Sequence, residues 1–75
     1  MDEIASLAQS RQLPPPPTRR ALRIASGLTT QEVANALGVT RSAVHRWETG
    51  KRNPSGELRI RYADLLRDLA GVVAR

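Results

Sequence analysis

The fold is decided by residues 29–50, which read TTQEVANALGVTRSAVHRWETG. Thr29 and Glu32 have the spacing of a capping box, in which a threonine hydroxyl and a glutamate carboxylate each bond a free backbone N–H group at a helix start. We expect this helix to run through Leu37 and to end at Gly38, because glycine adopts the left-handed conformation of a helix terminus at little cost. The pattern therefore predicts a short helix with a sharp exit.

A second short helix is expected directly after this turn. Thr40 can cap it, residues 41–48 form it, and a glycine closes it. Ala34 is small where the second helix must cross the first, and Val44 is placed to fill the gap between the two. This arrangement is a helix-turn-helix, whose second helix presents its N-terminal end and one flank to the major groove of DNA.

The second helix has two different faces on a helical wheel. Val44 and Trp47 fall on the side that is expected to face the core. The opposite side is polar and cationic, and it carries the residues that we predict to face outward: Arg41, Ser42, His45 and Arg46.

Further helices are expected on both sides of this motif. Thr18 can cap a helix that begins at Arg19, and Ser55 can cap a last, long helix that runs to the C-terminus. Together these helices form the expected main domain, residues 18–75.

Residues 1–17 are expected to form an N-terminal arm. Asp2 can cap a helix that is too short to be stable alone, and the four prolines at 14–17 are expected to form a non-helical polyproline II rod about 12 Å long. Residues 11–17 also fit the ligand pattern of SH3-type domains, a basic residue followed by PxxP. Two interpretations stay open for the arm: a spacer, and a docking segment for a protein partner.

Composition limits the class of protein. Seventy-five residues form one small domain, and the absence of Phe, with one Trp and one Tyr, favours an all-α fold over a β-rich one. There is no Cys and a single His, so disulfides, thiolate metal sites and His clusters are excluded. No nucleophile–base set is visible, so we expect neither an enzyme nor a cofactor. No apolar run approaches the roughly 20 residues of a membrane span, and a cytoplasmic protein is expected.

Charge points to a polyanion as partner. The net charge is +5, and residues 18–56 carry seven cations against two carboxylates. This excess suits a surface that binds nucleic acid. The alternative is a solvated surface that happens to be basic.

Over about residues 19–66 the sequence resembles the lambda-repressor-like, or XRE/Cro-type, helix-turn-helix family. The segments that carry the resemblance most specifically are Gly27-Leu28-Thr29, Leu37-Gly38-Val39 and Trp47-Glu48 followed by Gly50. The resemblance implies a compact bundle of about five short helices that binds double-stranded DNA as a dimer.

The resemblance also implies roles for single residues. Arg41, Ser42 and Arg46 match positions that reach base edges, with His45 at the margin. Arginine suits guanine, whose O6 and N7 it bonds bidentately. Positions that contact phosphate are matched by Thr29, Thr30, Gln31, Thr40, Lys51, Arg52 and Asn53, although the family usually places Gln where this chain has Thr30. The structural positions are Arg23, Ala34, Gly38, Val44, Trp47 and Glu48, with Arg23 and Glu48 paired as a partly buried salt bridge.

The last helix is expected to be longer than the minimal domain requires. Its apolar stripe continues beyond Leu66 through Leu69, Val72 and Val73. We interpret this surplus as a homodimer interface; the alternative is that it packs residues 1–13.

The sequence favours one function among three. The first is specific binding to a near-palindromic operator, as in a small Cro-like repressor of phage or mobile-element type. The second is an antitoxin that uses the same fold to bind a toxin and regulate its own gene. The third is a protein-binding adaptor without DNA affinity, which the cations Arg41 and Arg46 argue against.

Overall fold

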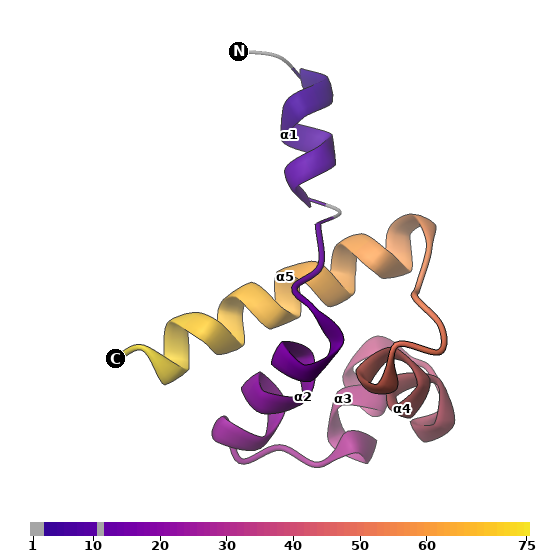
Figure 1. The fold of residues 1–75 in the computed structure, drawn as a ribbon, viewed down its shortest axis with the longest axis vertical. Coiled ribbons are helices and arrows are strands. Elements are labelled where there is room, and N and C mark those ends of the chain that lie inside the picture. The colour runs from indigo at the N-terminus through magenta and orange to yellow at the C-terminus, as the bar shows by residue number, and fades with distance from the viewer. Residues whose placement is uncertain (1–2, 11) are drawn as a thin grey trace.

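The computed structural model describes residues 3–10 and 12–75, and every regular element in these ranges is an α-helix. The helices are α1 (Glu3–Ser10), α2 (Pro16–Ala25), α3 (Thr30–Leu37), α4 (Arg41–Thr49) and α5 (Gly56–Val73). The predicted all-α fold with a helix-turn-helix is confirmed, with α3 and α4 as the two helices of the motif (Figure 1).

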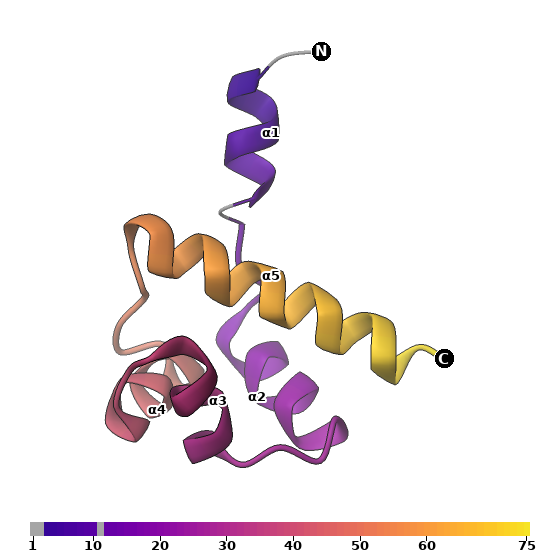
Figure 2. The ribbon, with the colours of Figure 1, turned by 180° about the vertical axis from the view of Figure 1, so that it is seen from behind.

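The helices are arranged around α5. In both views α2, α3 and α4 lie together on one side of α5, while α1 stands on the other side and projects away from the bundle (Figures 1 and 2). The chain crosses α5 between α1 and α2, and α1 contacts α5. Asp2, the predicted cap of α1, and Arg11 of the proline pattern lie outside the described residues.

The core joins α3, α4 and α5. Trp47 of α4 and Tyr62 of α5 are 4 % and 1 % exposed, and their ring centroids are 4.8 Å apart at an interplanar angle of 44°. The remaining buried side chains of this cluster are aliphatic: Val33, Ala34, Leu37, Val44 and Leu66. The aromatic pair supplies the two largest side chains of this small core and joins α4 to α5.

The start of α2 differs from the prediction. The helix begins at Pro16 with Pro15 as its N-cap residue, so the expectations of a non-helical rod through residue 17 and of a Thr18 cap are wrong. Instead, the N–H groups of Thr18 and Arg19 donate to the carbonyl oxygen of Pro15. Proline is tolerated in a first helical turn because the N–H groups there have no partner within the helix, and its fixed φ suits the turn.

The C-terminal helix also corrects two expectations. Ser55 stands at the N-cap of α5, but its side chain makes no capping hydrogen bond. Leu69 is only 8 % exposed, so the core extends one turn beyond Leu66, and the prediction that Leu69 serves a dimer interface is wrong for the chain as it folds. Val72 and Val73 are 51 % and 44 % exposed, and this part of the predicted stripe does face solvent.

Candidate nucleic-acid interface

The N-terminus of α3 is built as the capping box predicts. Thr29 Oγ1 accepts from the backbone N–H of Glu32 at 3.0 Å, and Glu32 Oε1 accepts from the N–H of Thr29 at 2.9 Å. Thr30 and Gln31 follow in the first turn, where free N–H groups and the positive end of the helix dipole favour an anion. This end of α3 can therefore receive a phosphate.

The turn between α3 and α4 requires glycine. Gly38 has φ 70° and ψ 33°, in the left-handed region, and the N–H of Val39 donates to the carbonyl of Ala34 at 3.0 Å. Thr40 Oγ1 then accepts from the N–H of Ala43 at 3.1 Å and caps α4. The predicted turn and cap are confirmed, and together they set the direction in which α4 leaves the turn.

The inner face of α4 is sealed against the bundle. Val44 is fully buried, as is Ala34 of α3, and Trp47 and Glu48 are also buried. A larger side chain at Ala34 would collide with the helix packed over it, since this side chain has no exposed surface. The predicted inner face is confirmed.

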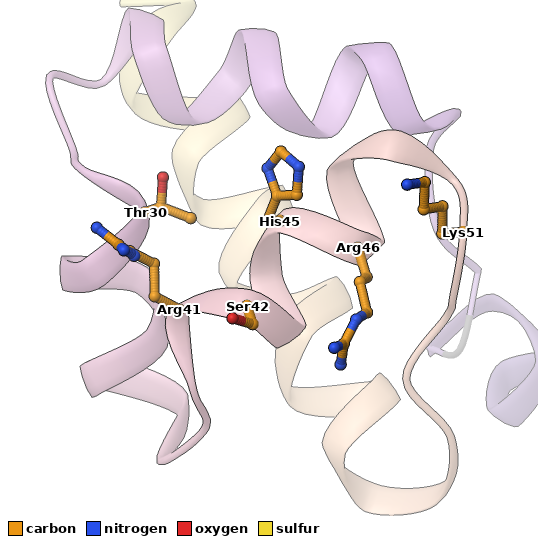
Figure 3. A pocket seen from close by; sticks show the side chains of 6 residues that line it. All are labelled: Thr30, Arg41, Ser42, His45, Arg46 and Lys51. Atoms are coloured by element: carbon orange, nitrogen blue, oxygen red, sulfur yellow. The ribbon is translucent and has the colours of Figure 1, made fainter.

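The outer face of α4 is open and cationic. Arg41, Ser42, His45 and Arg46 are all exposed, as predicted. They line a surface concavity of about 530 Å³ together with Thr30 from the start of α3 and Lys51 from the loop after α4 (Figure 3). Three of the six lining residues are cations and none is a carboxylate, so the concavity offers a phosphate or a base edge only donors, hydroxyls and an imidazole.

The other residues predicted to contact phosphate lie outside this lining. Thr29, Gln31, Thr40, Arg52 and Asn53 are exposed. Four of them also have structural bonds: Thr29 and Thr40 cap α3 and α4, Gln31 Nε2 donates to Asn35 Oδ1 at 2.8 Å, and Asn53 Oδ1 accepts from Arg19 at 2.7 Å.

A side-on ion pair ties α2 to the end of α4. Arg23 Nε lies 2.6 Å from Glu48 Oε2, and Arg23 Nη2 lies 3.0 Å from Glu48 Oε1. Arg23 Nη1 also donates to the carbonyl of Leu28 at 2.9 Å. The hydrogen bond to Glu48 is the main cause of the raised pKa of Arg23, and burial opposes it. The structural role predicted for the pair agrees with this geometry.

Sequence reasoning missed two arginines that position the motif. Arg19 is 5 % exposed and bonds the end of α4, while Arg61 of α5 donates to the carbonyls of Ala36 and Leu37 at the end of α3. Arg19 stands one helical turn before Arg23, a spacing that places both on one face of α2. Nothing in the sequence links Arg61 to residues 24 and 25 positions earlier.

The described residues were also compared with the requirements of a metal site and of a membrane-spanning helix. Within the described ranges, no group of three or more His, Cys, Asp or Glu side chains is placed to hold a metal ion. None of the described helices combines the length and the apolar character that a membrane crossing needs.

The motif consists of two capped helices with a glycine turn between them, and the second helix has a cationic outer face. These features define a DNA-binding helix-turn-helix domain. A family model described as a helix-turn-helix domain matches residues 20–70. The chain belongs to this family of XRE/Cro-like DNA-binding domains, which act in transcription regulation and are typically not enzymes. Searches of the curated proteins and of the solved structures give no match.

Proposed function

We propose that this protein is a small Cro-like repressor that binds a specific double-stranded DNA operator and regulates transcription in the cytoplasm. The observation that carries the proposal is the outer face of α4, where Arg41, Ser42, His45 and Arg46 are exposed beside one concavity while the opposite face is buried. A helix held in this way can enter a major groove without leaving the bundle.

Base reading is assigned to the outer face of α4. Arg41 and Arg46 each form a bidentate bond to guanine, worth about 1–3 kcal/mol of discrimination against another base. Ser42 bonds a base edge between them, and His45 contributes at the margin. The exposure of these side chains at one concavity supports this assignment.

Phosphate contacts are assigned to both ends of the motif. Thr29, Thr30 and Gln31 surround the N-terminus of α3, and Thr40 stands at the start of α4. Lys51, Arg52 and Asn53 form the loop after α4. These contacts set the register of α4 on the duplex and carry no sequence information themselves.

The operator is proposed to be near-palindromic, because one recognition helix covers too few base pairs to define a site in a genome. A homodimer with two half-sites about 34 Å apart supplies the missing contacts. Val72 and Val73 are the exposed apolar side chains at the C-terminal end of α5, and they are proposed to form part of the subunit contact.

An antitoxin is the second candidate. The observation that favours it is the projecting α1, which stands clear of α2, α3 and α4 (Figure 1). Ile4 of this helix is 75 % exposed. Such an arm, with the prolines that follow it, can present a binding segment to a toxin without disturbing the DNA-binding face. Co-purification of a toxin from the native host is the result that separates this candidate from the repressor.

Selection of bound sequences from a random duplex pool tests the DNA-binding proposal. The expected result is an enriched near-palindromic sequence with a guanine in each half-site, bound with an affinity that falls steeply with salt. A matched control is the Arg41→Ala/Arg46→Ala double variant, which should enrich no sequence. Equal binding of wild type and double variant to every duplex would contradict sequence-specific recognition.

A further inference from the structure

The guanidinium of Arg19 is buried at the centre of a junction between three segments. Nε donates to the carbonyl of Pro14 at 2.7 Å, and Nη1 donates to the carbonyl of Trp47 at 3.0 Å and to Asn53 Oδ1 at 2.7 Å. All three acceptors are neutral oxygens. Burial of a charge costs free energy unless hydrogen bonds replace its hydration. The buried guanidinium therefore depends on these three hydrogen bonds, and the three acceptors must stay within its reach.

Each acceptor belongs to a different part of the chain. Pro14 precedes α2, Trp47 lies in the last turn of the recognition helix α4, and Asn53 lies in the loop that follows. The last four carbonyls of a helix lack partners within it, and a cation is favoured at that negative end of the dipole. Arg19 therefore donates to a carbonyl group in the last turn of α4, just before the loop that is proposed to contact phosphate.

Pro16 of α2 lies close to the start of the same loop. Gly50 ends α4 in the left-handed conformation with φ 78°, and a Cβ atom added there would lie 3.3 Å from Pro16 Cγ. The N–H groups of Lys51 and Arg52 then both donate to the carbonyl of Arg46, at 3.0 and 3.3 Å. The loop therefore begins beside α2, and two of its backbone N–H groups are bonded to α4.

We propose that Arg19 is a positioning residue for DNA binding: through Asn53 it holds the loop of residues 50–53 so that Lys51, at the rim of the recognition concavity, meets a phosphate. This inference rests on the proposed function. It gives Asn53 a task in addition to any phosphate contact: the side-chain oxygen of Asn53 accepts from Arg19, and the Nδ2 amide group is the part of this side chain that can donate to a phosphate. Burial lowers the pKa of Arg19, yet an arginine in a protein keeps its charge.

The salt dependence of DNA affinity distinguishes positioning from a direct contact. Asn53 is neutral, so if it merely bonded a phosphate, Asn53→Ala would weaken binding without changing the slope of log affinity against log salt. If it positions Lys51, Asn53→Ala loses one ionic contact, and the magnitude of the slope falls by about 0.9. Asn53 is exposed, so the variant is expected to keep its fold.

A double-mutant comparison gives a second, independent readout. Arg19→Met should lower the slope by about the same 0.9, although a buried guanidinium cannot release a counterion itself. Lys51→Ala should then cause no further loss in the Arg19→Met background. Arg67→Met removes the same charge from the exposed Arg67, which pairs with Asp64 on α5, and should leave the slope unchanged. If Arg19→Met does not fold, Asn53→Ala with and without Lys51→Ala decides the question.

Amide hydrogen exchange separates failure of this inference from failure of the proposed function. Exchange at Lys51 and Arg52 should be faster in Asn53→Ala than in wild type, with or without DNA. Unchanged exchange together with an unchanged salt slope would overturn the positioning role. Faster exchange in a protein that binds no duplex would overturn the proposed function and leave the junction as a support of the loop alone.

Discussion

Arg23 and Glu48 are 25 residues apart in sequence and form a bidentate ion pair with N–O distances of 2.6 and 3.0 Å. The Arg23 and Glu48 side chains are 13 % and 5 % exposed. The pair therefore fixes α2 against the end of the recognition helix in a place that water hardly reaches. Removal of either partner leaves the other charge buried without its ion-pair partner.

We expect Glu48→Ala to lower the free energy of unfolding by about 3–5 kcal/mol, because it leaves Arg23 buried without its carboxylate. Urea unfolding followed by Trp47 fluorescence measures this loss. Glu48→Gln is the matched control, since it keeps the size and one acceptor while it removes the charge. A folded Glu48→Ala protein of wild-type stability that had selectively lost DNA binding would refute the structural role of the pair.

Trp47→Ala should lower the free energy of unfolding by about 3–5 kcal/mol and unfold so small a domain. The reason is the loss of the ring pair between Trp47 and Tyr62, which joins α4 to α5 at a centroid distance of 4.8 Å. Circular dichroism of the variant and of Trp47→Phe tests this, with the phenylalanine variant expected to remain folded. A Trp47→Ala protein with native helix content and a cooperative transition at the wild-type midpoint would show that the pair is dispensable.

The type of DNA contact can be tested by comparison of exposed cations. Arg41→Ala and Arg46→Ala should each cost about 1–3 kcal/mol on the selected operator and relax preference at one base pair. Lys51→Ala should weaken specific and random duplexes alike and lower the salt slope by about one. If Arg41→Ala lost affinity equally on all sequences, its assignment to base reading would be wrong.

The stability of the domain should fall at alkaline pH. Burial raises the pKa of Tyr62 from 10.0 to about 12, with the nearby Glu48 charge as a second cause. Above pH 10 the unfolded chain releases the phenolic proton while the folded chain keeps it, so the stability present below pH 10 is lost progressively up to about pH 12.

Phenolate absorbance follows this titration, because Tyr62 is the single tyrosine of the sequence. Tyr62→Phe should remove its part of the stability loss between pH 10 and 12. Phenolate absorbance that rises near pH 10 in the fully folded protein would show that Tyr62 is not shielded by its burial.

The dimer is tested at the exposed end of α5. Val72→Glu combined with Val73→Glu should leave the fold intact, since both side chains face solvent, and should abolish cooperative binding to the two half-sites. Sedimentation of wild type and double variant, free and on the selected DNA, provides the measurement. Monomeric binding of both proteins with one affinity would remove Val72 and Val73 from any subunit contact.

The sequence by itself determined the helix-turn-helix and the two faces of α4. The local features of this motif involve residues only a few positions apart, so their hydrogen bonds follow from local spacing. They are the capping box of Thr29 and Glu32, the cap at Thr40 and the left-handed Gly38. Helical periodicity likewise separated buried Val44 from exposed Arg46. These features depend little on what the rest of the chain does.

Only the tertiary structure decided where the helices meet and which outlying residues belong to the core. Proline is compatible both with a helix that begins at Pro16 and with a polyproline II rod. In the folded chain Pro16 lies beside Gly50, and Arg19 bonds Trp47 and Asn53, which favours the helix. The apolar stripe runs through Leu69, Val72 and Val73 alike, and only the packing of the helices shows that Leu69 is buried while the two valines are exposed. The physical reason is that contacts between residues 28 or 34 positions apart depend on how the helices cross, which no local spacing specifies.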